Sequence, residues 1–134
     1  MIVINKNELN PIVVTLTESP NYNNNTFFLF VFENKANGNV KYFQSEDITT
    51  FGLRYNKFLV NEDVTEDLLN ATIHLTGNTQ QLNYKIFGLD SEITTDEDLT
   101  IAYNDKMTYG NPCEEGLVRV VGLEEDITIN NIYL

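Results

Sequence analysis

The stretch TFFLFVFENKANGNVKYF, residues 26–43, contains the clearest fold signal in the sequence. A half-buried strand alternates apolar and polar residues, but residues 27–32 are apolar at every position. One face of such a strand would hold Phe28, Phe30 and Phe32, and the other would hold Phe27, Leu29 and Val31. A polar segment with Asn37-Gly38 follows and favours a turn, and residues 40–43 are strand-like again. The stretch therefore predicts a β-hairpin whose first strand is apolar on both faces.

Two kinds of cover for the second face of this strand are conceivable, the chain itself or another molecule. Residues 90–99 are long enough to lie over it, but they are mostly acidic and would make a poor lid. Natural monomers rarely leave large apolar patches exposed, which favours cover by the chain itself. Part of the face formed by Phe27, Leu29 and Val31 is nevertheless a candidate contact with a partner.

Other short strand-like segments follow one another along the chain and are separated by turn signals. They are residues 11–18, 53–60, 71–76, 81–88, 99–103, 116–121 and 127–134. Residues 62–70 are the segment expected to form a helical turn, because acidic residues favour a helix start. The pattern predicts one all-β domain, residues 1–134. Its expected architecture is an antiparallel β-sandwich, immunoglobulin-like or jelly-roll-like, with about seven to nine short strands.

The charge balance limits the possible partners. The chain has 20 acidic and 8 basic residues and a net charge of −12. Such a charge repels phosphate, so neither nucleic acid nor an anionic membrane is an expected partner. The longest apolar run, residues 27–32, is too short to span a membrane. The N-terminal residues also lack the apolar core of a signal peptide.

Candidate catalytic and cofactor sites are few. His74 is the one histidine and falls on the polar side of its strand, where we expect a surface residue. Cys113 is the one cysteine, so no internal disulfide can form, and the adjacent acidic residues make its thiol less reactive. The acidic segments 61–67, 90–98 and 123–126 could offer oxygen ligands to calcium, but they lack EF-hand spacing and are expected to be solvated loops. We therefore expect neither an enzyme nor a bound cofactor.

Arg54 and the ends of the chain are further candidates for partner contacts. Arg54 is expected to pair with a carboxylate, within the chain or across an interface. Residues 1–5 and 127–134 are strand-like and lack the charges or proline that usually protect an edge strand. They could pair with each other or with their own sheet, or one end could add a strand to a neighbouring protein. The C-terminal candidates are Ile127, Ile129, Tyr133 and Leu134.

A series of short motifs occurs in one order along the chain. The motifs are LTE (16–18), Pro20 with Tyr22, FLFVFEN (28–34), KYF (41–43), DIT (47–49), RYNKF (54–58), YKIF (84–87) and EEGLVRV (114–120). This series resembles a group of small β-rich virion proteins from tailed phages of Bacteroidetes hosts, including crAss-like phages. The resemblance spans about residues 12–121 and rests on order and spacing, because each motif is short.

Two positions depart from the pattern of this group. Residues 23–25, all asparagine, widen the gap before the phenylalanine-rich strand, and Phe87-Gly88 stands where the group has Tyr-Glu. Neither change would break a sandwich, but both could move a contact surface.

The resemblance implies a virion structural protein that is made in the bacterial host cytoplasm. Its expected partners are other virion proteins of the capsid or a fibre, and it could be a homo-oligomer on the particle. The first hypothesis is an auxiliary or decoration protein on the outer capsid surface. One alternative is an adaptor that seats a head or tail fibre. A second is a carbohydrate-binding module that contacts the host surface, where exposed tyrosines could stack on sugars.

Overall fold

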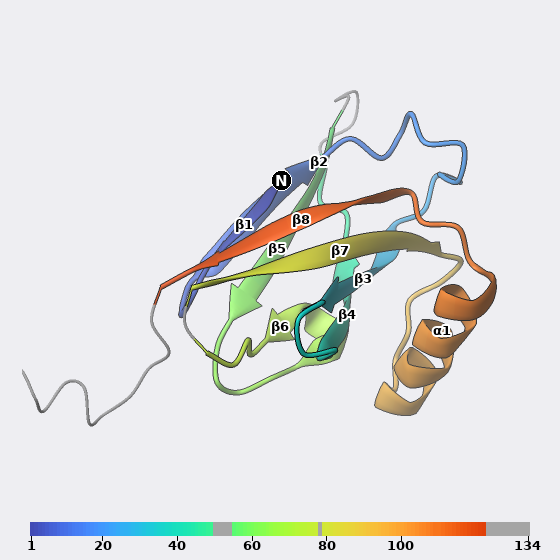
Figure 1. The fold of residues 1–134 in the computed structure, drawn as a ribbon. Helices are drawn as coiled ribbons and strands as arrows, with labels where there is room; N and C mark the ends of the chain where they lie inside the picture. Colours follow the sequence, from blue (N-terminus) through green and yellow to red (C-terminus); the bar gives the residue numbers. More distant parts are fainter. Residues whose placement is uncertain (50–54, 78, 123–134) are drawn as a thin grey trace, which may run out of the picture.

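Two β-sheets and an α-helix form the described part of the chain, residues 1–49, 55–77 and 79–122 of a computed structural model (Figure 1). The five-stranded sheet has the order β1-β8-β7-β3-β4, and the three-stranded sheet has the order β2-β5-β6. The elements are β1 (Ile2–Asn5), β2 (Leu9–Val14), β3 (Phe27–Glu33), β4 (Val40–Glu46), β5 (Asn56–Glu62), η1 (Leu68–Asn70), β6 (Thr72–Ile73), β7 (Gln80–Leu89), α1 (Asp96–Tyr109) and β8 (Glu114–Val121). The prediction of a mostly β, sandwich-like fold is confirmed.

The core between the two sheets is built around the phenylalanine-rich strand. Phe28, Phe30 and Phe32 of β3 are buried on the inner face, as predicted. The Phe30 ring lies 4.9 Å from Phe58 of β5, edge to face, and 5.1 Å from Phe43 of β4. These ring contacts join strands of both sheets and add to the energy of apolar burial.

The strand pairing is mixed. The hairpin of β3 with β4 is antiparallel, as predicted, and so are the pairs of β7 with β3 and β8. Two pairs, β1 with β8 and β5 with β6, are parallel, so the expectation of a purely antiparallel arrangement is wrong. Alternation within a strand indicates which face is buried, but it does not specify the neighbour or its direction.

Two shorter segments differ from their predicted extents. Residues 71–76 contain only the two-residue strand β6, although the alternation is as predicted, with Ala71, Ile73 and Leu75 buried. Residues 62–70 contain one short 3-10 helix, η1, at their end. Glu62 itself belongs to β5, because the strand continues one full alternation past Val60.

Residues 99–103 were predicted to be a strand, and this prediction is wrong because they lie inside α1. The Thr95 side chain caps the helix by accepting a hydrogen bond from the Asp98 amide at 3.1 Å. Three acidic residues occupy the first turn, where the helix dipole favours them, and Lys106 lies in the last turn. The Gly110 amide then donates to the Lys106 carbonyl oxygen as the helix ends.

α1 covers the second apolar face of β3. Leu29 and Val31 are 0% and 2% exposed, and they form a second apolar cluster with Leu99 of the helix. The rings of Tyr42 and Tyr103 stack at 4.3 Å beside this cluster. Figure 1 shows α1 at one end of the molecule, away from β1. The chain itself therefore covers Leu29 and Val31, which is the alternative favoured from the sequence. The expectation that this part of the face remains open to a partner is wrong.

The segment before α1 is fixed to the sheet by a buried glutamine. The Gln44 side chain donates to the carbonyl oxygens of Leu69 and Ile93 at 3.1 Å each, and it accepts from the Ile93 amide at 2.6 Å. These bonds hold the acidic segment in place without burying its carboxylates. An acidic segment can therefore precede a helix that covers the sheet. Its contacts with the sheet are made by apolar residues such as Ile93 and by the side-chain amide of Gln44, and not by its carboxylates.

The N-terminal strand pairs within its own sheet. Ile2, Val3 and Ile4 lie in register with Val118, Arg119 and Val120 of β8. Ile2 and Ile4 are buried in the main core. For this end of the chain, pairing with its own sheet is the alternative that the structure shows.

Candidate functional site

The outward positions of β2 and β5 form an exposed apolar surface on the three-stranded sheet. The register places Pro11 opposite Leu59. Leu9, Val13 and Leu59 keep 58%, 57% and 38% of their surface exposed. We call this surface the β2–β5 outer face, and its residues are Leu9, Pro11, Val13, Lys57, Leu59 and Asn61.

The charge of the β2–β5 outer face differs from that of the whole chain. Its six residues include no acid, although the chain has 20 acidic and 8 basic residues. Lys57 is the charged member of the face. β2 is an edge strand among the described residues, and Pro11 within it lacks an N–H group, which discourages the addition of another strand. The surface therefore suits contact through side chains from above the sheet.

Sequence reasoning missed this surface because residues 11–14 are all apolar or proline, so their pattern does not indicate which face of the strand is exposed. In the structure Asn10 points inward, and its side chain accepts from the Asn5 amide at 2.7 Å and donates to the Asn5 carbonyl oxygen at 3.0 Å. The inward asparagine places the apolar residues on either side of it on the outer face. Nothing in the local pattern indicates that an asparagine, rather than its apolar neighbours, faces the core.

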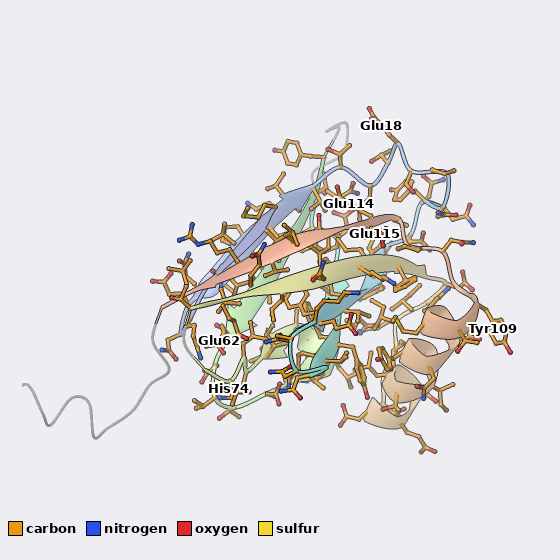
Figure 2. All side chains as sticks on the ribbon, viewed as in Figure 1. Glu18, Glu62, His74, Tyr109, Glu114 and Glu115 are labelled. Carbon is orange, nitrogen blue, oxygen red and sulfur yellow. The ribbon has the colours of Figure 1, made fainter. Side chains whose placement is uncertain are left out.

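Buried charged side chains hold residues 74–77, which lie between β6 and β7. The Lys6 Nζ donates to two carbonyl oxygens of this segment. Glu62 Oε2 accepts from the Leu75 amide at 2.7 Å and lies 3.3 Å from His74 Nδ1 (Figure 2). Lys6 and Glu62 are only 7% and 1% exposed. Burying a charge is costly unless it is paired and hydrogen-bonded, and both of these groups have at least two such partners.

Glu66 is a second carboxylate that contacts the same segment. Its Oε2 accepts from the His74 amide at 3.1 Å and lies 2.7 Å from Lys41 Nζ. Burial raises the pKa of Glu66, but the hydrogen bonds from Lys41 and His74 outweigh burial and lower its pKa below the ordinary value. The expectation that His74 is a simple surface residue is therefore corrected, since it is half-buried between two glutamates.

A pocket of about 440 Å³ lies between the β3–β4 hairpin and residues 74–77. Asn34 Nδ2 donates to Gln80 Oε1 at 3.3 Å, and Gln80 Nε2 donates to the Thr76 carbonyl oxygen at 2.7 Å. These bonds join the two walls. We call this site the hairpin pocket, and its lining includes Asn34, Asn37, Asn39, Lys41, Gln80 and Leu82.

The residues proposed from sequence as partner contacts are not brought together at these sites. Leu29 and Val31 are buried under α1 and are not accessible in this fold, and Phe27 is half-buried at the margin of the same cluster. Arg54 lies outside the described residues, as do Ile127, Ile129, Tyr133 and Leu134.

The groups considered for catalysis belong to different segments, since Cys113 directly precedes β8 and His74 lies between β6 and β7. Burial raises the pKa of the Cys113 thiol, and its Sγ donates to the Asn21 carbonyl oxygen at 3.5 Å. Within residues 1–49, 55–77 and 79–122, no cluster of three or more His, Cys, Asp or Glu side chains is arranged to hold a metal ion. In the same residues no helix has the length and apolar character needed to cross a membrane.

Comparison with known proteins found no matching family, no similar curated protein and no similar solved structure.

Proposed function

We propose that the protein is a bacteriophage virion structural protein, an auxiliary or decoration protein on the outer capsid surface. The observation that supports a docking role is the β2–β5 outer face, which exposes Leu9, Val13 and Leu59 on a regular sheet. The assignment to a virion rests on the series of motifs between LTE (16–18) and EEGLVRV (114–120).

The charge distribution indicates what the docking partner looks like. A net charge of −12 repels acidic surfaces, so close approach is easiest where acidic residues are absent, as on the β2–β5 outer face. The matching surface on a capsid subunit is apolar at its centre, with an acceptor for Lys57 at its margin. Contacts of this kind combine an apolar centre with a polar rim. The rest of the acidic surface then faces solvent.

The adaptor alternative uses the same face but differs in stoichiometry. The copy number of a decoration protein scales with the number of capsid subunits, whereas the copy number of an adaptor scales with the number of fibres or with the symmetry of the tail. Quantitative mass spectrometry of purified virions measures this ratio directly. A ratio near that of the capsid subunit supports decoration, a much lower ratio supports the adaptor, and absence of the chain from the virion rejects both.

Substitutions on the β2–β5 outer face test the docking surface itself. Val13→Glu places an acid among the exposed apolar side chains of this face, and we expect this variant to fold but to lose association with particles that lack the wild-type chain. Leu117→Glu is a matched control, since Leu117 is an exposed apolar residue on β8 of the other sheet. Full association of Val13→Glu, or equal loss in both variants, contradicts docking through this face.

A further inference from the structure

We propose that the hairpin pocket binds a neutral saccharide, as one or two units of a glycan. The pocket shares no residue with the β2–β5 outer face. The proposal therefore does not depend on the docking role.

Both walls of the hairpin pocket are held in place before any ligand arrives. In the hairpin, the Asn34 amide donates to the Asn39 carbonyl oxygen at 2.8 Å, and the Asn37 side chain accepts from the Asn39 amide at 2.9 Å. Gly38 has a φ of 75°, which a residue with a side chain rarely adopts. On the other wall, Lys6, Glu62 and Glu66 hold residues 74–77. Walls fixed in this way reduce the entropy lost on binding.

The lining matches the chemistry of sugar hydroxyls. Each Asn or Gln side chain has one oxygen acceptor and two N–H donors, so it can bond a hydroxyl as donor or as acceptor. Among the described residues, the Asn39 side-chain amide makes no hydrogen bond, and Asn37 uses only its oxygen. The Asn39 side chain and the Asn37 side-chain N–H groups therefore remain available to bond a ligand.

The charges around the pocket disfavour an anionic ligand. Lys41 is the lysine of the lining, and it is paired with Glu66 at 2.7 Å. His74, which also lines the pocket, lies beside the buried carboxylate of Glu62. No described lining residue offers a cation without a nearby carboxylate, and the chain as a whole is strongly acidic. A neutral hydroxyl-rich molecule meets no such barrier.

The size and floor of the pocket also suit a sugar. Its volume of about 440 Å³ falls within the range of roughly 300–1,000 Å³ for small-molecule sites. Val40 and Leu82 provide apolar surface for the C–H face of a sugar ring. The exposed tyrosines considered from the sequence are not part of this site, since neither Tyr55 nor Tyr109 lines the pocket.

The test uses the full chain and named probes. A glycan array identifies binders, and NMR titrations follow with methyl glycosides of glucose, galactose, mannose and N-acetylglucosamine, and with inorganic phosphate. We expect at least one neutral sugar to shift the side-chain amide signals of Asn37 and Asn39. Asn39→Ala should then weaken binding about three- to tenfold, as expected for the loss of one or two hydrogen bonds.

Asn104→Ala is the matched control, because Asn104 is an exposed asparagine on α1 outside the pocket. Unchanged binding in this variant, together with the loss in Asn39→Ala, supports the proposal. Three results overturn it. They are no neutral sugar binding, equal affinity in Asn39→Ala and wild type, and binding of phosphate in place of sugars.

Discussion

Replacing Leu99 with alanine tests whether α1 is held on the sheet by this side chain. Leu99 is the one buried residue of α1, all of which the structure describes. It packs in the second apolar cluster with Leu29, Val31 and Phe87. The substitution keeps a good helix former at the position, so its effect reports on packing and not on helix propensity.

The expected cost follows from the burial of Leu99, which is 1% exposed. Leucine-to-alanine changes at buried sites cost about 2–5 kcal/mol, depending on how far the site can collapse. Here the neighbouring Ala102 and Tyr103 are only partly buried, and a helix on the surface can shift toward the sheet. We therefore expect a loss of about 2–3 kcal/mol, a large share of the roughly 5–15 kcal/mol that stabilises a typical domain.

Urea unfolding followed by circular dichroism measures this loss. If α1 leaves the sheet in the variant before the rest unfolds, the folded state already exposes the cluster around Leu29, and the denaturant slope decreases. Binding of a hydrophobic dye to the native variant would then increase. The denaturant slope and the dye binding therefore distinguish local undocking of the helix from uniform destabilisation of the fold.

Ile101→Ala is the matched control on the same helix. Ile101 is 59% exposed, and surface changes of this kind usually stay within about 0.5 kcal/mol. Leu99→Ala and Ile101→Ala should therefore differ by about 1.5 kcal/mol or more. Equal stability of the two variants would refute the conclusion that Leu99 anchors α1.

Other perturbations test the core and the titrating groups. Phe30→Ala should cost about 3–5 kcal/mol in urea unfolding, and a loss below about 1 kcal/mol would show that the ring is not in a packed core. The lowered pKa of Glu66 means that its ionised form stabilises the fold above its unfolded pKa, a contribution that is lost as the pH falls through the folded pKa. Glu66→Gln should therefore flatten the stability profile below the unfolded pKa of about 4.5, and an unchanged profile counts against the pair with Lys41. Burial, followed by the charge of Glu114, raises the pKa of Tyr84 from 10.0 to about 12. The stability contributed by neutral Tyr84 should be lost between these two pH values, and Tyr84→Phe should abolish that loss in alkaline unfolding curves.

The positions of most strands followed from local sequence, because burial on a strand leaves a two-residue pattern. β3 lies where the apolar run predicted it, β7 lies where the alternating segment 81–88 predicted it, and β8 includes the predicted residues 116–121. The inner face of β3 was also assigned correctly. In each case the signal lies within one segment, so it does not depend on which strand is the neighbour.

α1 escaped prediction because its apolar residues do not form a helical stripe. Leu99, Ile101 and Tyr103 alternate over a short distance and so resemble a strand. The signal that could have identified the helix is Thr95 followed three residues later by Asp98, with acids in the first turn. The helix is buried through Leu99 and a few partly buried side chains, so its apolar pattern is weak.

Both candidate sites combine residues that are distant in the sequence. The hairpin pocket brings the asparagines of residues 34–39 against residues 74–77, which are held by Lys6, just after β1, and by Glu62 of β5. The β2–β5 outer face depends on the register of two strands and on the inward direction of Asn10. No local pattern encodes either arrangement.

Composition and local alternation were enough to predict the β-rich class, the strand that is apolar on both faces and the strongly acidic character, because these are properties of single segments. Three features could be seen only in the folded chain: α1 covers Leu29 and Val31, β1 and β8 run parallel, and certain apolar residues remain exposed. A face is buried only when another element packs against it. That choice depends on the energies of contacts between segments far apart in the chain, and not on the residues of either segment alone.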